Sequence, residues 1–140
     1  MPSVIDLTPL RRALALLNEA VVFWHAQPDG SALKPHLRSA LIQSFEFSYE
    51  LSVRLLRRVL IERAASADTV ADLSFNDLLR GGADHGLLGD PLRWRQWREL
   101  RNATAHAYNE AKAQAVAAAV EVFATDAMAL LASMEAELGA

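Results

Sequence analysis

The sequence predicts an all-α protein, an antiparallel up-and-down bundle of four main helices plus one short helix. Apolar residues recur at intervals of three and four along its long segments, which is the period of a helix with a buried face. Clusters of Pro, Gly, Asp and Ser separate these segments, and no segment alternates apolar and polar residues as a strand does. Hydrophobic residues make up 52% of the 140 residues, so we expect a single domain spanning residues 1–140 around one core.

The first helix is expected to begin near Thr8, which can cap it, with Pro9 in its first turn. A turn-forming run at residues 27–31 ends it. One apolar stripe follows the helical period along it, formed by Leu7, Leu10, Leu14, Leu17, Val21 and Trp24.

The second helix is expected to run from near Pro35 to near Ala64, and it is apolar on more than one side. Such a helix is usually central in its domain, or it packs against both its own domain and a partner. Two stripes run along it, the first formed by Leu37, Leu41, Ser44, Ser48, Leu51, Leu55 and Val59, and the second by Ile42, Phe45, Tyr49, Val53, Leu56 and Leu60.

Two carboxylates, Glu46 and Glu50, lie in the most aromatic part of this second helix. A carboxylate in apolar surroundings needs a partner, because otherwise it takes up a proton. The nearest candidate partners are the arginines of the helix that follows Asp90. The alternative for each carboxylate is that it points to solvent along a narrow polar strip.

Three further elements follow. Residues 65–73 are expected to form a link, and Ser74 with Asp77 resembles a capping box that opens a short helix from Phe75 to Arg80. The glycines at 81 and 82 are expected to stop that helix. The next helix opens at Asp90 and Pro91. It combines charge with the apolar residues Leu92, Trp94, Trp97 and Leu100.

The last helix is expected to begin near Asn109 or Glu110 and to run almost to the end of the chain. Its remaining positions are mostly alanine, which permits close helix packing within the monomer or across an interface. Its buried face is predicted to consist of Val116, Val120, Phe123, Ala127, Leu130, Met134 and Leu138.

The composition argues against several classes of protein. There is no cysteine, which excludes disulfides and thiolate metal sites, and the net charge of −3 argues against a general polyanion binder. No apolar run approaches the ~20 residues that span a bilayer, and the N-terminus lacks a secretory signal pattern, so we expect a cytoplasmic protein without a membrane segment. His25, His36 and His85 show no metal-ligand spacing, and no phosphate loop is present, so neither a metal nor a cofactor is expected.

One polar cluster stands out, at residues 101–110. Asn102 and His106 are one helical turn apart, and Arg98 lies on the same ridge. The guanidinium of Arg101 is suited to hold a phosphodiester and to stabilise charge in its transition state, and His106 is suited to move protons near neutral pH. Together they fit metal-free RNA cleavage, in which the 2′-hydroxyl attacks the adjacent phosphate. That reaction needs two proton-transfer groups, and a second copy facing the first across a dimer axis would supply the second histidine.

The spacing from Arg101 to His106 is a weak signal when taken alone. A histidine in such a place more often caps a helix end or makes a hydrogen bond in the core. From the residues alone, catalysis and a stabilised helix corner therefore both stay open.

The same cluster carries a family resemblance. Arg101-Asn102-x3-His106-x-Tyr108 followed by Asn-Glu resembles the signature of HEPN-domain proteins (higher eukaryotes and prokaryotes nucleotide-binding), and more narrowly that of the nucleotidyltransferase substrate-binding protein family. The segment at residues 43–51, with its Phe-Glu-Phe run, and the layout from Ser74 to Trp94 are similar to the same family. One departure is Val53, where the family often carries Trp.

The resemblance implies a helical bundle that forms a homodimer and pairs with a minimal nucleotidyltransferase encoded nearby. Many such pairs are toxin–antitoxin systems in which the HEPN subunit is a ribonuclease. By that likeness Arg101 and His106 would be catalytic, and Tyr108 would match a tyrosine that some partners modify with AMP. By the same likeness Asn102 would support their geometry; from their own positions in the sequence, Glu46, Glu50 and Arg98 are further candidate supporting residues.

Three hypotheses follow. The chain is a metal-independent RNA-cleaving toxin restrained by its nucleotidyltransferase, or it is a non-catalytic subunit that helps the nucleotidyltransferase hold a nucleotide or another substrate. The third hypothesis is a helical dimer whose polar cluster only stabilises a helix corner. The complete motif favours the first hypothesis, and the acidic net charge favours the second.

Overall fold

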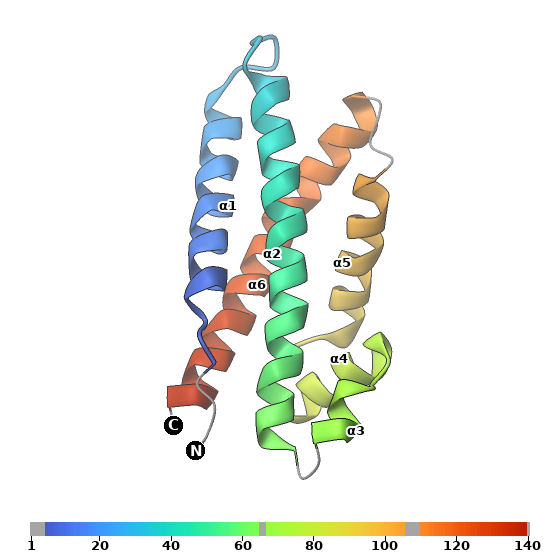
Figure 1. The fold of residues 1–140 in the computed structure, drawn as a ribbon. Coiled ribbons are helices and arrows are strands. Elements are labelled where there is room, and N and C mark those ends of the chain that lie inside the picture. Colours follow the sequence, from blue (N-terminus) through green and yellow to red (C-terminus); the bar gives the residue numbers. More distant parts are fainter. Residues whose placement is uncertain (1–4, 65–66, 106–109, 140) are drawn as a thin grey trace.

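The computed structural model describes residues 5–64, 67–105 and 110–139, which form six helices and no strand. Four of these helices are long and two are short, and they are α1 (Thr8–Ala26), α2 (Lys34–Arg63), α3 (Ala67–Ala71), α4 (Phe75–Asp84), α5 (Pro91–Thr104) and α6 (Glu110–Gly139). The all-α prediction is confirmed. In Figure 1 the long helices run alternately up and down, and α6 crosses behind α2 so that the C-terminal end returns to the N-terminal end.

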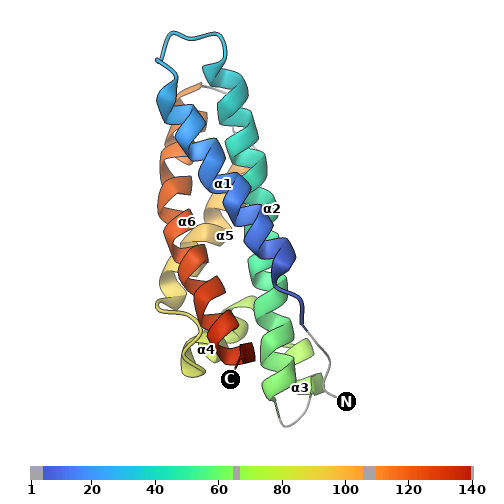
Figure 2. The same ribbon diagram turned by 90° about the vertical axis from the view of Figure 1, so that its left-hand side faces the viewer.

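Helix α2 is the centre of the bundle, because it contacts α1, α5, α6 and both short helices. Figure 2 shows α1 and α2 side by side, with α6 to their left and α5 farther back. Residues of both stripes predicted for this helix are buried in the core. The buried residues of α2 are Lys34, Leu41, Phe45, Ser48, Tyr49, Leu51, Ser52, Leu55, Leu56, Val59 and Leu60.

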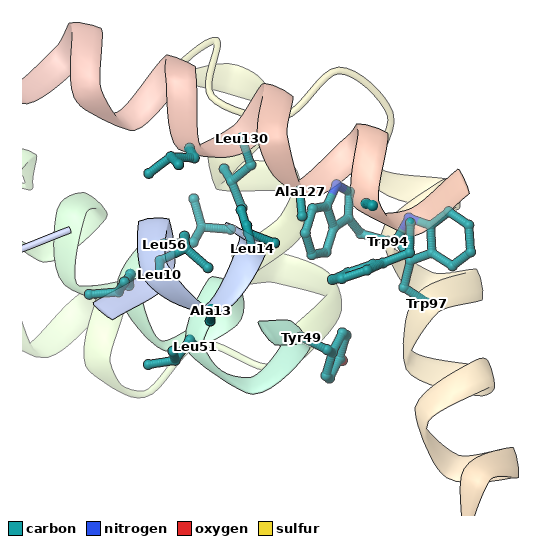
Figure 3. Close-up of a cluster of buried hydrophobic side chains, with 14 of the residues drawn as sticks. Leu10, Ala13, Leu14, Tyr49, Leu51, Leu56, Trp94, Trp97, Ala127 and Leu130 are labelled. Carbon is teal, nitrogen blue, oxygen red and sulfur yellow. The ribbon is translucent and has the colours of Figure 1, made fainter. Parts of the chain in front are cut away.

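An aromatic cluster around Phe123 joins α2, α5 and α6. The Phe123 ring meets Phe45, Trp94 and Trp97 edge to face, with ring centroids 4.9, 5.8 and 5.7 Å apart. Figure 3 shows Trp94 and Trp97 side by side next to Ala127 of α6. Leu92, another apolar residue of this helix, is 62% exposed. The tryptophans thus fix α5 against the bundle.

The start of α1 corrects one predicted cap. Thr8 is the first helical residue and Leu7 holds the N-cap position without a side-chain hydrogen bond. The carboxylate of Asp6 accepts from the Thr8 backbone N–H at 2.9 Å instead. The predicted N-caps Ser74 and Asp90 are confirmed, since each side chain accepts from a backbone N–H in the first turn of α4 or α5.

The predicted link at residues 65–73 is wrong in part, because it contains α3. Arg57 donates from Nη1 to the carbonyl oxygens of Val70 and Leu73, both at 3.0 Å. These bonds add to the packing of Val70 against the core. Arg57 of α2 thus helps to hold this short helix and the residues after it in place.

The glycines at 81 and 82 do not stop α4, which continues to Asp84. Gly86 ends it with a left-handed φ of 74°, while the N–H of Leu87 donates to Gly82 O at 2.9 Å and that of Gly86 to Ala83 O at 3.0 Å. This is the Schellman pattern of helix termination. Gly82 serves packing, since a Cβ there would lie only 3.1 Å from Cδ1 of Leu88.

Helix α6 is long and apolar enough to cross a membrane by length and composition, which the sequence analysis did not anticipate. The core helix of a bundle can have the same length and composition, and α6 contributes buried residues to the core. Of the seven residues predicted for its buried face, all but Leu138 are buried, and Leu138 is partly buried against the core.

Candidate functional site

Helix α5 brings one of its arginines, Arg101, against α2. Trp94 and Trp97 are buried against α6, and Arg101 follows one turn later in the last turn of α5. Figure 1 shows α5 beside α2, and the two helices are in contact. The side chain of Arg101 thereby reaches the acidic positions of α2.

Arg101 lies between the two carboxylates of α2. Its Nη1 is 2.8 Å from Oε2 of Glu46, and its Nη2 is 3.0 Å from Oε1 of Glu50. Its Nε also donates to Oε1 of Glu50 at 3.2 Å. Both glutamates therefore have the arginine partner that the sequence analysis expected from this helix.

Neither carboxylate is buried, although both sit in the aromatic part of α2. The side chains of Glu46, Glu50 and Arg101 are 28%, 50% and 30% exposed. Glu50 therefore also fits in part the alternative prediction, that the carboxylate points to solvent along a polar strip of α2. One guanidinium stands between two carboxylates, so the three groups carry one net negative charge when all are ionised.

Thr104 completes this group and was missed by the sequence analysis. Its Oγ1 donates toward Oε2 of Glu46 at 2.8 Å and lies 2.6 Å from the carbonyl oxygen of Arg101. It also accepts from Nη1 of Arg101 at 3.3 Å. The signal that could have found it is the spacing, because residues three apart on a helix share a face. We call Glu46, Glu50, Arg101 and Thr104 the Arg101 cluster.

Tyr49 lies close to this cluster, within electrostatic reach of Arg98 and Arg101. Burial raises the pKa of Tyr49 to about 12, while the positive charges of Arg98 and Arg101 act in the opposite direction. The phenol is therefore neutral at physiological pH.

Two predicted supporting residues lie outside the hydrogen-bonded cluster. The guanidinium of Arg98 stacks over the ring of Phe75, 4.8 Å from its centroid, and so connects α5 to the start of α4. Asn102 is exposed at the end of α5. His106 and Tyr108 fall outside the described residues, so the predicted Arg–His pair and the modified tyrosine stay predictions.

The larger of the two cavities described lies at the opposite end of α5. It has a volume of about 560 Å³ and is formed by residues 86–90 together with Arg93, Trp94 and part of α6. Arg93 and Trp94 at this cavity precede Arg101 by about two helical turns, so the cavity and Arg101 are on the order of 10–15 Å apart along the helix axis. The chemistry of the motif therefore lies away from this cavity. Among the described residues, no group of three or more His, Asp or Glu side chains could hold a metal ion.

Comparison with known proteins gives the family. Residues 5–136 match the family described as nucleotidyltransferase substrate binding protein like. A Haemophilus influenzae protein named probable ribonuclease HepT is 34% identical over 137 residues, which cover 94% of this chain and 92% of the relative. A solved H. influenzae structure, described as the fold of a substrate-binding domain of a nucleotidyltransferase, matches with a TM-score of 0.85 and 34% identity over 93% of this chain and 99% of that one.

These matches span nearly all of the helices described above, and they agree with the resemblance carried by the Arg101–Tyr108 motif. On this evidence the chain belongs to the family of nucleotidyltransferase substrate-binding-like proteins.

Proposed function

We propose that this protein is a metal-independent ribonuclease, the toxin of a toxin–antitoxin pair, which cleaves RNA with the Arg101-x4-His106-x-Tyr108 motif. The observation that carries the proposal is the Arg101 cluster, which holds a guanidinium at the surface at the start of that motif. The H. influenzae relative named probable ribonuclease HepT supports the same reading. Arginine is the side chain best suited to bind phosphate through two parallel hydrogen bonds.

In the proposed reaction Arg101 holds the scissile phosphate and stabilises the negative charge that develops on it. One histidine takes the proton of the 2′-hydroxyl, whose oxygen attacks the adjacent phosphorus. A second histidine donates a proton to the departing 5′-oxygen. The products are a 2′,3′-cyclic phosphate and a 5′-hydroxyl end. His106 and its copy in a homodimer supply the two histidines, and Asn102 and Arg98 support the site.

The proposal includes a partner and a control point. The partner is a minimal nucleotidyltransferase encoded nearby, and both proteins act in the cytoplasm. The phenol oxygen of Tyr108 takes AMP from ATP with release of pyrophosphate; this places a negative phosphate close in sequence to His106 and Arg101 and blocks the phosphate site by charge repulsion. Incubation with the partner and ATP should add the mass of AMP to Tyr108, and a wild-type protein that stays unmodified removes this part.

The test of the ribonuclease proposal is growth on induction together with cleavage of RNA by purified protein in EDTA. Wild type should arrest growth without the partner and leave cyclic-phosphate ends on RNA, while His106→Ala should do neither. Harmless expression combined with intact RNA contradicts the proposal. Equal toxicity of His106→Ala and wild type contradicts the assigned chemistry. A monomeric mass at micromolar concentration contradicts the two-histidine site.

A second candidate function is a non-catalytic subunit that binds nucleotide or another substrate for the nucleotidyltransferase. It is favoured by the acidic balance of the Arg101 cluster, where two carboxylates surround one guanidinium. The solved relative described as a substrate-binding domain points the same way. This function predicts intact RNA, together with a lower KM of the nucleotidyltransferase for its substrate when this protein is present.

A further inference from the structure

Thr104 occupies a position where three polar groups converge. A hydroxyl has one proton to donate, and both Glu46 Oε2 and the carbonyl oxygen of Arg101 lie within reach of it, at 2.8 and 2.6 Å. The charged carboxylate is the stronger acceptor. The lone pairs of the same oxygen face Nη1 of Arg101. Thr104 therefore bridges the backbone of α5, the guanidinium of that helix and the carboxylate of α2.

This bridge makes the two sides of the guanidinium unequal. The Nη1 side contacts Glu46 and Thr104, which also bond to one another. The opposite edge, formed by Nε and Nη2, contacts a single oxygen of Glu50. Glu46 is 28% exposed and Glu50 is 50% exposed. The Nη1 side of Arg101 is thus held by two partners that bond to one another, while the Nε–Nη2 edge is held by a single, more exposed carboxylate through two hydrogen bonds.

The edge held by Glu50 is the one that suits a phosphate. Nε–H and one N–H of Nη2 point in parallel, so two phosphate oxygens can accept from them at once. An exposed ion pair contributes little free energy, so phosphate can replace Glu50 there at small cost. Glu46 and Thr104 hold Nη1 together, and Glu46 is the less exposed of the two glutamates, which keeps the guanidinium in place during that exchange.

We propose that Thr104 is a positioning residue: it ties Glu46 to the Nη1 side of Arg101, so that the scissile phosphate of RNA replaces Glu50 at the Nε–Nη2 edge. This assignment rests on the proposed ribonuclease function for its substrate. It gives the two glutamates opposite roles. Glu46 helps Arg101 to bind phosphate, and Glu50 competes with the phosphate for the same edge.

The kinetic test compares Thr104→Val, which keeps the shape and removes the hydroxyl, with Thr104→Ser, which keeps the hydroxyl. Loss of one hydrogen bond to a charged group should lower kcat by about tenfold or more with a small change in KM, and serine should restore kcat to within about threefold of wild type. Thr125→Val is the matched control, because Thr125 is exposed on α6 and lies at the distant cavity. A Val variant with wild-type kcat, or a Ser variant as slow as Val, overturns the assignment.

The glutamate variants test the two sides without altering Thr104. Inorganic phosphate is titrated while the NMR signal of the Arg101 Nε–H group is followed. Glu50→Gln should tighten phosphate binding by about threefold or more, because a competing charge is removed, and Glu46→Gln should weaken it. Shifts of the same sign in both variants overturn the proposal, since a general change of charge or of folding acts in one direction.

The NMR measurement also separates this inference from the ribonuclease proposal. The Nε–H signal of Arg101 should be sharp in wild type and Thr104→Ser, and broadened in Thr104→Val. If wild type binds phosphate with this pattern and leaves RNA intact, the ribonuclease proposal fails and the positioning role stands. If wild type cleaves RNA and Thr104→Val leaves both kcat and the Arg101 signal unchanged, the positioning role fails alone.

Discussion

The indole N–H of Trp97 on α5 donates to Oδ2 of Asp126 on α6 at 2.8 Å, inside the aromatic cluster that fixes α5. The same oxygen accepts from Nε of Arg93, also at 2.8 Å. One carboxylate oxygen therefore holds two side chains of the helix that carries Arg101. Its hydrogen bonds to α5 cross the helix interface at the end away from the proposed site.

Asp126→Ala should destabilise the protein by about 1–3 kcal/mol, because the buried indole N–H loses its acceptor. Asp126→Asn keeps an acceptor oxygen at the same place, so it should cost less, about 1 kcal/mol or below. Urea denaturation of both variants measures the difference. Equal losses in the two variants would mean that the charge on Asp126, rather than the bond to Trp97, is what stabilises this contact.

The adjacent glycines of α4 should respond in opposite ways to alanine. A Cβ at Gly81 meets only Cδ1 of Leu60 at an ordinary 3.7 Å, so Gly81→Ala should gain about 0.5–1 kcal/mol of helix propensity. A Cβ at Gly82 meets Leu88 at 3.1 and 3.2 Å and Leu56 at 3.3 Å. Gly82→Ala should therefore lose about 1–2 kcal/mol net, because overpacking outweighs the propensity gain. Thermal melts of the two variants provide the comparison, and a stabilised Gly82→Ala would show that the leucines move aside.

Stability should fall in alkaline solution through Tyr49. Its pKa is raised by burial from the ordinary 10.0 to about 12, so the native state disfavours the phenolate relative to the unfolded chain. The contribution of this shift is fully present below pH 10, and it is lost as the pH rises from about 10 to about 12. The Tm of wild type should drop more steeply across this window than that of Tyr49→Phe, which has no phenol at this position. Parallel curves would assign the alkaline loss to other groups.

Arg101→Lys should lower RNA cleavage by about tenfold or more while leaving the fold intact. Lysine keeps the positive charge, but it cannot present two parallel N–H groups to a phosphate. The ion pairs of Arg101 are partly exposed, so their loss should change the free energy of unfolding by only about 1 kcal/mol. Arg95→Lys on the same helix is the matched control and should keep wild-type cleavage. Full activity of Arg101→Lys would reduce the role of Arg101 to that of a simple positive charge.

The sequence alone determined most of the architecture. The sequence placed α1, α2 and α6 and the start of α5 to within one or two residues, because burying one face of a helix requires a regular apolar spacing and the turn residues between helices mark their ends. Ser74 and Asp90 were identifiable as caps, since a cap depends only on its nearest neighbours in the chain. The Arg101–Tyr108 motif is likewise a run of neighbouring residues, so both the motif and the family resemblance could be recognised from the sequence.

Features that depend on contacts between segments distant in the sequence could be determined only from the tertiary structure. The role of Gly82 depends on Leu88 and Leu56, and α3 depends on Arg57, so local rules misplaced the end of α4 and overlooked α3. The sequence suggested that Glu46 and Glu50 need arginine partners, but it gave no means of ranking them. Their unequal exposure and the hydroxyl of Thr104 distinguish them, because a side chain's hydrogen bonds are set by how α2 and α5 pack.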